Sequence, residues 1–187
     1  MEKSCHLRSV IMFFSLIEKR RSIRKFKDQQ VEEKKIETLV EVALRSPSSM
    51  SRNPWEFIVV DDRDCLVKLS QSKPHGSAFI KGAPLGIVVC GDPAKCDVWV
   101  EDCSIASIII HLAAESLGLG SCWIQIRERM HNDEQTAGGY VSQLLNIPEH
   151  LEVESIMAVG YSDEQKPGHK KEDLLFDRVH RNAYGNK

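Results

Sequence analysis

The sequence has no long apolar run. A membrane-spanning helix needs roughly 20 consecutive apolar residues, and the longest candidate, Ile105 to Leu112, is short and interrupted by polar side chains. A signal peptide is not predicted either, because the first residues carry only a short apolar stretch and no small-residue cleavage site. We therefore expect a cytoplasmic protein that does not enter membranes.

The chain also has little net charge. Its 25 Lys and Arg residues nearly balance its 27 Asp and Glu residues, which leaves a formal charge of -2. Such a chain has no overall basic field that would hold nucleic acid or an anionic membrane, so neither is expected as a partner. A site for an anion must come from a local cluster. The length of 187 residues suits one domain with one sizeable core.

Several motifs that carry protein-based chemistry are missing. The six cysteines form no CxxC pair and the seven histidines show no HExxH spacing, so a metal site is not predicted. Neither GxSxG nor a P-loop occurs, and no GxGxxG follows the first strand, which argues against a Rossmann domain. Cys122 and His111 are interpreted as core residues rather than as a nucleophile and a ligand.

Helical and extended patterns alternate unevenly along the chain. Apolar spacing predicts helices at residues 12–20, 31–45, 65–70 with Asp64 as the cap, 97–117 and 134–145. Compact β-branched runs predict strands at residues 57–60, 85–90, 121–126 and 153–160. This order favours an α+β sandwich over a doubly wound sheet. The helix over 97–117 is apolar around most of its surface, so we expect it to bury both a core face and an interface face.

The first candidate site is a basic cluster, Arg20-Arg21-Ser22-Ile23-Arg24. In an extended chain, residues two apart share a face, so Arg20, Ser22 and Arg24 are expected to point the same way. Two guanidinium groups and a hydroxyl can grip a phosphate through charge-assisted hydrogen bonds. The alternative is a solvated basic stretch after a helix.

The second candidate site is the polar loop from Ser46 to Phe57, with the sequence SPSSMSRNPWEF. Its small hydroxyls and its amide supply donors and acceptors without blocking close approach, which suits a polar heterocycle or a ribityl chain. The alternative is a turn-rich connector, where Ser, Asn and Pro are common. Trp55 is interpreted as a core residue.

Two further segments are candidate binding sites. The segment Gly118 to Trp123 contains two glycines that would let the backbone approach a flat ring, or that simply mark a helix end before a strand. The tail Lys166 to Lys171 is a second cationic group, able to close over a phosphate or to form a solvated turn.

Taken together, in this order and spacing, these clusters resemble the nitroreductase family. The matching segments run from about Met12 to the C terminus and read FFSLIEKRRSIRKF, SPSSMSRNPWEFIVV, DVWVEDCSIASIIIHLAAESLGLGSCWIQ and AVGYSDEQKPGHKKEDL. The resemblance implies a single domain over residues 12–187, with residues 1–11 as an N-terminal extension. It also implies an α+β sandwich with a mostly antiparallel central sheet, assembled as a homodimer that binds FMN at its interface.

The resemblance further implies the residues that bind the cofactor. Arg20, Arg21, Ser22 and Arg24 would hold the FMN phosphate and ribityl chain, and Lys170 or Lys171 would complete the phosphate site. The partner subunit would supply Pro47, Ser48, Ser49 and Ser51, and Asn53 would contact the isoalloxazine edge. Gly120 and Ser121 would lie against the ring. Two positions depart from the family pattern, since Ser51 stands where Asn is common and Asn53 where Gln is common.

The function implied is oxidoreduction without a catalytic protein side chain. Hydride would pass from NADH or NADPH through flavin N5 to a nitroaromatic, a quinone or a similar flat acceptor in a ping-pong cycle. Three alternatives stay open at this point. They are a flavin-consuming or dehalogenating relative on the same scaffold, a flavin-binding redox sensor without turnover, and a structural domain whose basic clusters are solvated.

Overall fold

The computed structural model describes residues 12–187, so the predicted N-terminal extension lies outside the described residues. The chain divides into two compact units. We call Arg21–Gln165 the core unit, and the residues up to Arg20 together with Lys166–Lys187 the terminal unit.

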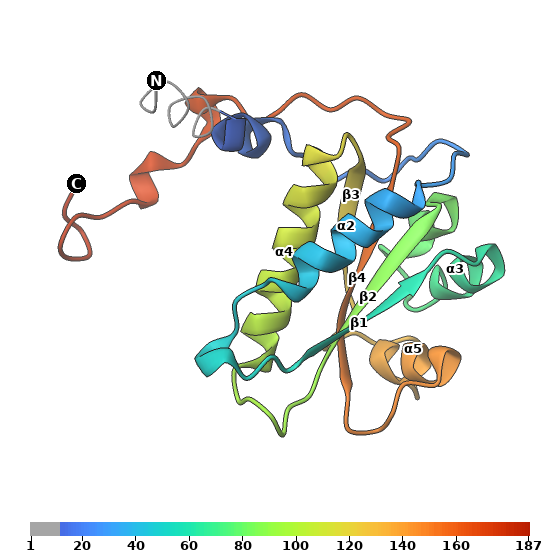
Figure 1. Cartoon of the computed structure of the whole chain (residues 1–187). Helices are drawn as coiled ribbons and strands as arrows, with labels where there is room; N and C mark the ends of the chain where they lie inside the picture. Colours follow the sequence, from blue (N-terminus) through green and yellow to red (C-terminus); the bar gives the residue numbers. More distant parts are fainter. Residues whose placement is uncertain (1–11) are drawn as a thin grey trace. The chain divides into compact units, whose positions relative to one another are not determined.

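The core unit is built on a four-stranded sheet (Figure 1). Its strands are β1 (Trp55–Val60), β2 (Leu85–Gly91), β3 (Gly120–Gln125) and β4 (Glu152–Gly160). They pair in the order β1-β2-β4-β3, and every pair is antiparallel. The predicted strands are therefore confirmed, with no end moved by more than two residues. The central strands β2 and β4 are buried on both faces, apart from Glu152, which explains their continuous apolar character.

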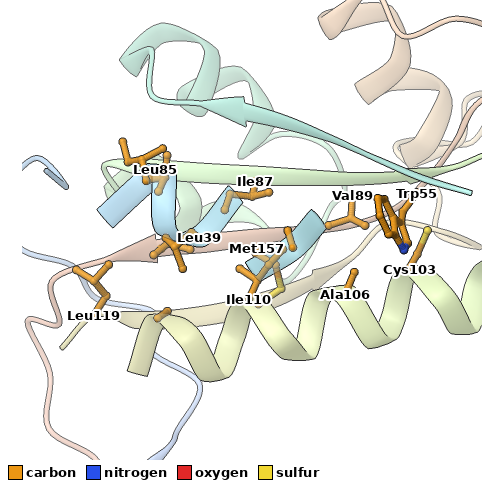
Figure 2. Close-up of a cluster of buried hydrophobic side chains, with 14 of the residues drawn as sticks. Leu39, Trp55, Leu85, Ile87, Val89, Cys103, Ala106, Ile110, Leu119 and Met157 are labelled. Atoms are coloured by element: carbon orange, nitrogen blue, oxygen red, sulfur yellow. The ribbon is translucent and has the colours of Figure 1, made fainter. Parts of the chain in front are cut away.

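Two pairs of helices cover the two faces of the sheet. On one face lie α2 (Glu33–Leu44) and α4 (Trp99–Ser116), whose side chains join one buried cluster with β2 (Figure 2). On the other face lie α3 (Arg63–Leu69) and α5 (Ala137–Leu145), which contribute to a second cluster. Trp55 and Leu39 belong to the first cluster, so the interpretation of Trp55 as a core residue is confirmed. This is the α+β sandwich predicted from the sequence.

The long helix α4 has two apolar faces, as expected. One face packs on the sheet through residues such as Ala106 and Ile110, which are fully buried. The other face leaves Ile105 and Ile108 exposed. The helix ends just before Gly118, whose φ of 73° is a left-handed conformation that favours glycine.

The starts of α2, α3, α4 and α5 differ from the prediction by two or three residues, and the hydrogen bonds explain two of these differences. Helix α3 begins at Arg63, and its cap is Asp62 rather than Asp64, because the Asp62 carboxylate accepts the Cys65 N–H at 2.7 Å. Helix α5 begins at Ala137, three residues later than predicted. Its start is delayed because the Asn132 side chain accepts backbone N–H bonds from the two residues that follow Asp133, which folds that stretch as a turn.

The terminal unit contains a helix over residues 12–19 and two short 3₁₀ turns, η3 (Lys171–Asp173) and η4 (Phe176–Arg178). It exposes many large apolar side chains for its size. These include Met12, Phe13, Phe14, Ile17, Leu174, Leu175, Phe176 and Val179. Within residues 12–187, no helix has both the length and the apolar character needed to cross a membrane.

Candidate functional site

The basic segment, defined as Arg21–Arg24, runs beside the edge strand β3. Ser22 forms a parallel bridge with Ser121, and the Ile23 N–H donates to the Ser121 carbonyl at 3.0 Å. The extended conformation assumed for the predicted common face is therefore confirmed at Ser22 and Ile23. The segment behaves as a short extra strand on the sheet, which fixes the direction of its side chains.

Ile23 anchors the basic segment in the core. It is buried, and a Cβ atom built on Gly120 would lie 2.8 to 2.9 Å from three atoms of the Ile23 side chain. Only glycine at position 120 leaves room for this contact. Because Ile23 points into the core, its neighbours Ser22 and Arg24 point to the opposite face. The predicted common face of Ser22 and Arg24 follows from this alternation.

The backbone of Arg24 has a hydrogen-bond partner that the sequence did not reveal. The backbone N–H groups of Arg24 and Lys25 both donate to the same Glu164 carboxylate oxygen, at 2.5 and 3.2 Å. The Arg24 guanidinium lies 5.8 Å from the centre of the Phe79 ring. Neither contact follows from local spacing, since Glu164 is 140 residues away in sequence.

The serine loop, defined as residues 47–53, precedes β1 and contains the turn η1 (Ser49–Ser51). Met50, Ser51 and Asn53 have φ values of 49°, 54° and 46°. Left-handed backbone at residues other than glycine costs roughly 1 kcal/mol or more per residue, and such outliers concentrate at functional sites. The Ser48 hydroxyl accepts the Asn53 N–H at 2.9 Å and donates to the Asn53 side-chain oxygen at 2.7 Å.

One buried carboxylate connects the serine loop to α4. The Ser49 N–H donates to Asp102 Oδ1 at 2.9 Å, and Asp102 is 3% exposed. Its neighbour Glu101 is exposed, because adjacent residues of a helix point to different faces. The role of Asp102 could not be found from the sequence, because Ser49 is 53 residues away.

A line of buried polar contacts joins α4 to the sheet. The His111 ring shares a hydrogen bond with the Ser121 hydroxyl, so the interpretation of His111 as a satisfied core residue is confirmed. Farther along, the hydroxyls of Ser107 and Ser155 lie 3.1 Å apart. Glu154, which precedes Ser155 in β4, is buried, and this burial raises the pKa of its carboxyl.

The buried thiols of Cys90 and Cys103 are poorly suited to act as nucleophiles. Burial raises the pKa of the Cys90 thiol to about 12, and burial raises the pKa of Cys103 further. Cys122 is buried in β3, as interpreted from the sequence. No disulfide forms among the five cysteines of residues 12–187. Thiols that stay protonated at neutral pH are poor nucleophiles.

The basic segment and the serine loop lie at diagonally opposite corners of the sheet. The segment adjoins β3 and the loop precedes β1, and these are the two edge strands. The register places Trp55 level with Glu152 at one end of β4, and Gly120 beside Gly160 at the other end. Three strand spacings and the length of β4 separate the two corners by on the order of 30 Å. One core unit therefore does not bring the two predicted clusters together.

The other predicted residues lie in the terminal unit, in β3 and in the serine loop. Arg20, Lys170 and Lys171 belong to the terminal unit, where both lysines are exposed. Gly120 and Ser121 are buried in β3: Ile23 covers Gly120, and the Ser121 side chain faces His111. Pro47, Ser51 and Asn53 are exposed at the surface of the serine loop.

A cavity of about 460 Å³ opens beyond the C-terminal end of β3. Arg127, Arg129, Trp99 and the start of α5 line it, together with the acids Glu128 and Glu152. The Arg127 guanidinium lies 5.8 Å from the centre of the Trp99 ring and is paired with Glu128 at 2.9 Å. An aromatic ring beside arginine side chains suits a flat molecule that carries negative charge.

Comparison with known proteins agrees with this architecture. The model of the nitroreductase family matches residues 17–73 and 65–161. A provisionally named NADH dehydrogenase/NAD(P)H nitroreductase from Archaeoglobus fulgidus is 37% identical over 174 residues, which cover 90% of this chain and 97% of the relative. An iodotyrosine deiodinase from Thermotoga neapolitana is 24% identical over 195 residues, covering 88% of this chain and 96% of the relative.

A solved structure gives a similar result. The FMN-dependent nitroreductase from Clostridium difficile R20291 superposes with a TM-score of 0.89 at 48% identity, covering 90% of this chain and 98% of that one. The fold, the order of the clusters and these matches define an enzyme of the oxidoreductase class. The chain belongs to the nitroreductase family.

Proposed function

We propose that this protein is an FMN-dependent oxidoreductase that uses NADH or NADPH to reduce a nitroaromatic, a quinone or a similar flat acceptor. The names of its relatives support the donor and the cofactor, since one is an NAD(P)H nitroreductase and another an FMN-dependent nitroreductase. When bound, FMN supplies the hydride chemistry between NAD(P)H and the acceptor, and the two substrates occupy the same place in turn.

The donor set of the basic segment fits the phosphate end of FMN. Ser22 and Arg24 offer a hydroxyl and a guanidinium group on one face of a segment that is fixed to the sheet, and Arg21 adds a second guanidinium group on the same segment. The Glu164 carboxylate on the Arg24 and Lys25 amides shows that this stretch already binds an anionic oxygen. Arg20, Lys170 and Lys171 are sequence-based candidates for the same phosphate.

The serine loop fits the ring end. Its surface presents Ser51 and Asn53, while Pro47, Ser48 and Ser49 shape the turn behind them. These groups offer donors and acceptors of the kind that a flavin edge requires. We infer that Gly120 and Ser121 approach the ring with their main chain, because their side-chain positions face Ile23 and His111.

The diagonal separation of these two clusters is the main support for the proposal of a homodimer. One core unit holds them on the order of 30 Å apart at opposite corners of its sheet. A second copy can place its serine loop beside the basic segment of the first. The exposed side chains Ile105 and Ile108 of α4 give the core unit an apolar face for that second copy.

The first test is the visible absorbance spectrum of the purified protein, with the released chromophore identified by chromatography. We expect bound FMN and steady oxidation of NAD(P)H in the presence of a quinone. A colourless protein that takes up no added FMN would overturn the proposal. Bound FMN without turnover would favour the flavin-binding sensor instead.

A second test asks whether one site uses two chains. Arg24→Ala damages the basic segment, and Asn53→Ala damages the serine loop. Heterodimers of the two variants, purified through two different affinity tags, are expected to regain tight FMN binding at one site of two. In such a dimer, one site combines an intact segment with an intact loop. If both variants weaken FMN binding and the heterodimer recovers none of it, the two-chain site is wrong.

The single variant Arg24→Ala tests the phosphate assignment. Loss of a charge-assisted hydrogen bond is worth about 1.5–3 kcal/mol, so we expect FMN affinity to fall at least about tenfold. Lys25→Ala is the matched control, because Lys25 is exposed and uses its backbone amide rather than its side chain at this site. Retention of wild-type FMN affinity by Arg24→Ala would remove Arg24 from the phosphate site.

A further inference from the structure

Asp102 is a buried carboxylate that core packing does not account for. It lies in the first turn of α4, and its neighbours in the sequence, Glu101 and Cys103, are an exposed acid and a buried core thiol. Burying a carboxylate is unfavourable unless hydrogen bonds compensate for the lost water. The bond from the Ser49 N–H to Asp102 Oδ1 supplies part of that compensation.

The second carboxylate oxygen, Oδ2, raises the free-energy cost of burying Asp102. Among residues 12–187, Asp102 Oδ2 is one of four buried side-chain atoms for which the structure gives no hydrogen-bond partner. An apolar residue in this place would avoid the cost, so a partly satisfied buried acid calls for a functional reason. The observation points to the serine loop, since that is where the bonded oxygen is directed.

The serine loop needs an external support because its backbone is strained. Met50, Ser51 and Asn53 all have left-handed φ values. Other hydrogen bonds of the loop, such as those between Ser48 and Asn53, are internal to it. They preserve the shape of the loop but do not hold it against the core unit.

The other side-chain connection from the loop is much weaker. Arg52 and Asp97 are 3.9 Å apart, and both side chains are exposed. An exposed ion pair of this kind contributes little. The buried bond between Ser49 and Asp102 is therefore the main polar attachment of the loop to α4.

We propose that Asp102 is a positioning residue for the FMN site: its carboxylate holds the Ser49 amide and so fixes the serine loop in the conformation that meets the flavin. The proposal rests on the proposed function, in which this loop contacts FMN. It assigns to Asp102 no contact with substrate or cofactor.

Helix α4 connects Asp102 to the other parts of the proposed site. The same helix contacts β3 through His111, which is bonded to Ser121 beside the basic segment. Asp102 and His111 are nine residues apart, about 13.5 Å along a helix. Between them lie Ile105 and Ile108, the exposed residues of the proposed dimer face. One rigid helix thus connects the serine loop, the dimer face and the strand that carries the basic segment.

The test compares Asp102→Ala, Asp102→Asn and the control Glu101→Gln in the full-length protein. FMN is titrated into the flavin-free dimer and followed by quenching of its fluorescence. Hydrogen exchange of the peptide that contains Ser49 is measured without FMN. Thermal unfolding of each flavin-free variant reports any general loss of stability.

We expect Asp102→Ala to weaken FMN binding about tenfold or more and to speed exchange in the serine loop. Asp102→Asn keeps a carbonyl oxygen that can accept the Ser49 N–H, so it should restore most of both properties. Glu101→Gln should match wild type. A role confined to core stability would lower the unfolding temperature of Asp102→Ala and leave FMN affinity and loop exchange unchanged, which would overturn the proposal.

The outcomes also separate this proposal from the proposed function. If wild type binds FMN and Asp102→Ala binds it equally well, the role of Asp102 is wrong while the flavoenzyme stands. If wild type binds no FMN, the proposed function is wrong. The role of Asp102 in positioning a cofactor is then wrong as well. Loop exchange in Asp102→Ala then shows whether the bond to Ser49 holds the loop at all.

Discussion

The basic segment and the serine loop are held in place by different means. The segment is bonded to an edge strand and anchored by Ile23, which fills the space above Gly120. The loop has a strained backbone, and one buried carboxylate attaches it to α4. The segment therefore belongs to the cooperative core, whereas the loop can open locally at much lower cost.

This difference suits the proposed chemistry of the two ends of the flavin. A phosphate needs fixed charges, and the sheet provides a rigid support for them. The ring end must admit two substrates in turn, and a loop supported at one point can adjust. Substitutions in the basic segment should consequently affect global stability, whereas substitutions in the serine loop should affect ligand affinity at nearly constant stability.

The largest expected effect is that of Gly120→Val. The added side chain would collide with Ile23, so we expect a loss of about 2–3 kcal/mol of unfolding free energy together with weaker FMN binding. Urea unfolding measures the first effect and fluorescence titration the second. Gly138→Ala is the control, because a Cβ at Gly138 meets no atom within 4 Å. Equal stability of the two variants would refute the anchoring role of Ile23.

Ser121→Ala tests whether the Ser121 hydroxyl stabilises the core or binds the cofactor. Removing the hydroxyl leaves the buried His111 ring without this partner, so we expect a loss of about 1–2 kcal/mol of unfolding free energy. FMN affinity should change less than twofold, because the hydroxyl faces His111 rather than solvent. The opposite result, lost affinity with unchanged stability, would place the Ser121 side chain in the cofactor site.

Glu154→Gln should make stability less dependent on pH. Burial raises the folded-state pKa of Glu154 above the ordinary value of 4.5 for a glutamate side chain. Below pH 4.5 both states are protonated and the two proteins should be similar. As the pH rises toward the folded-state pKa, only the unfolded wild type ionises, so wild type loses stability relative to the variant. Urea unfolding from pH 4 to 8 measures this, with the exposed Glu152→Gln as control. A constant difference across this range would contradict the prediction.

Met50→Gly should have the smallest effect. Glycine relieves the left-handed backbone at this exposed position, so unfolding free energy should rise by less than about 1 kcal/mol. Arg52→Gly is the control, since Arg52 has a φ of -75° that any residue adopts, and it should be slightly destabilising. Thermal unfolding distinguishes the two. A loss of stability in Met50→Gly equal to that in Arg52→Gly would show that the loop is not strained there.

The sequence predicted most of the fold because each strand is encoded by a short run of neighbouring residues. The β-branched runs at 57–60 and 85–90 lie inside β1 and β2, and the apolar spacing of residues 97–117 covers α4. The helix starts were less accurate. Asp62 and Asp64 are both acceptable caps by residue type, and the choice between them depends on which carboxylate reaches a free N–H in the folded turn.

The predicted site was only partly accessible to sequence reasoning. The alternation of Ser22, Ile23 and Arg24 follows from the geometry of an extended chain. The contacts of Glu164 with the basic segment and of Asp102 with the serine loop join residues 140 and 53 positions apart. No spacing rule reaches across such distances, so both residues were missed.

The sequence by itself determined which residues alternate, which runs are buried and which small residues permit close packing, because these properties depend on near neighbours along the chain. It also carried the resemblance to the nitroreductase family. Tertiary structure decided that the basic segment and the serine loop occupy opposite corners of one sheet, and that Asp102 supports the loop. The order and register of strands set those relations, and they depend on contacts between residues far apart in the chain.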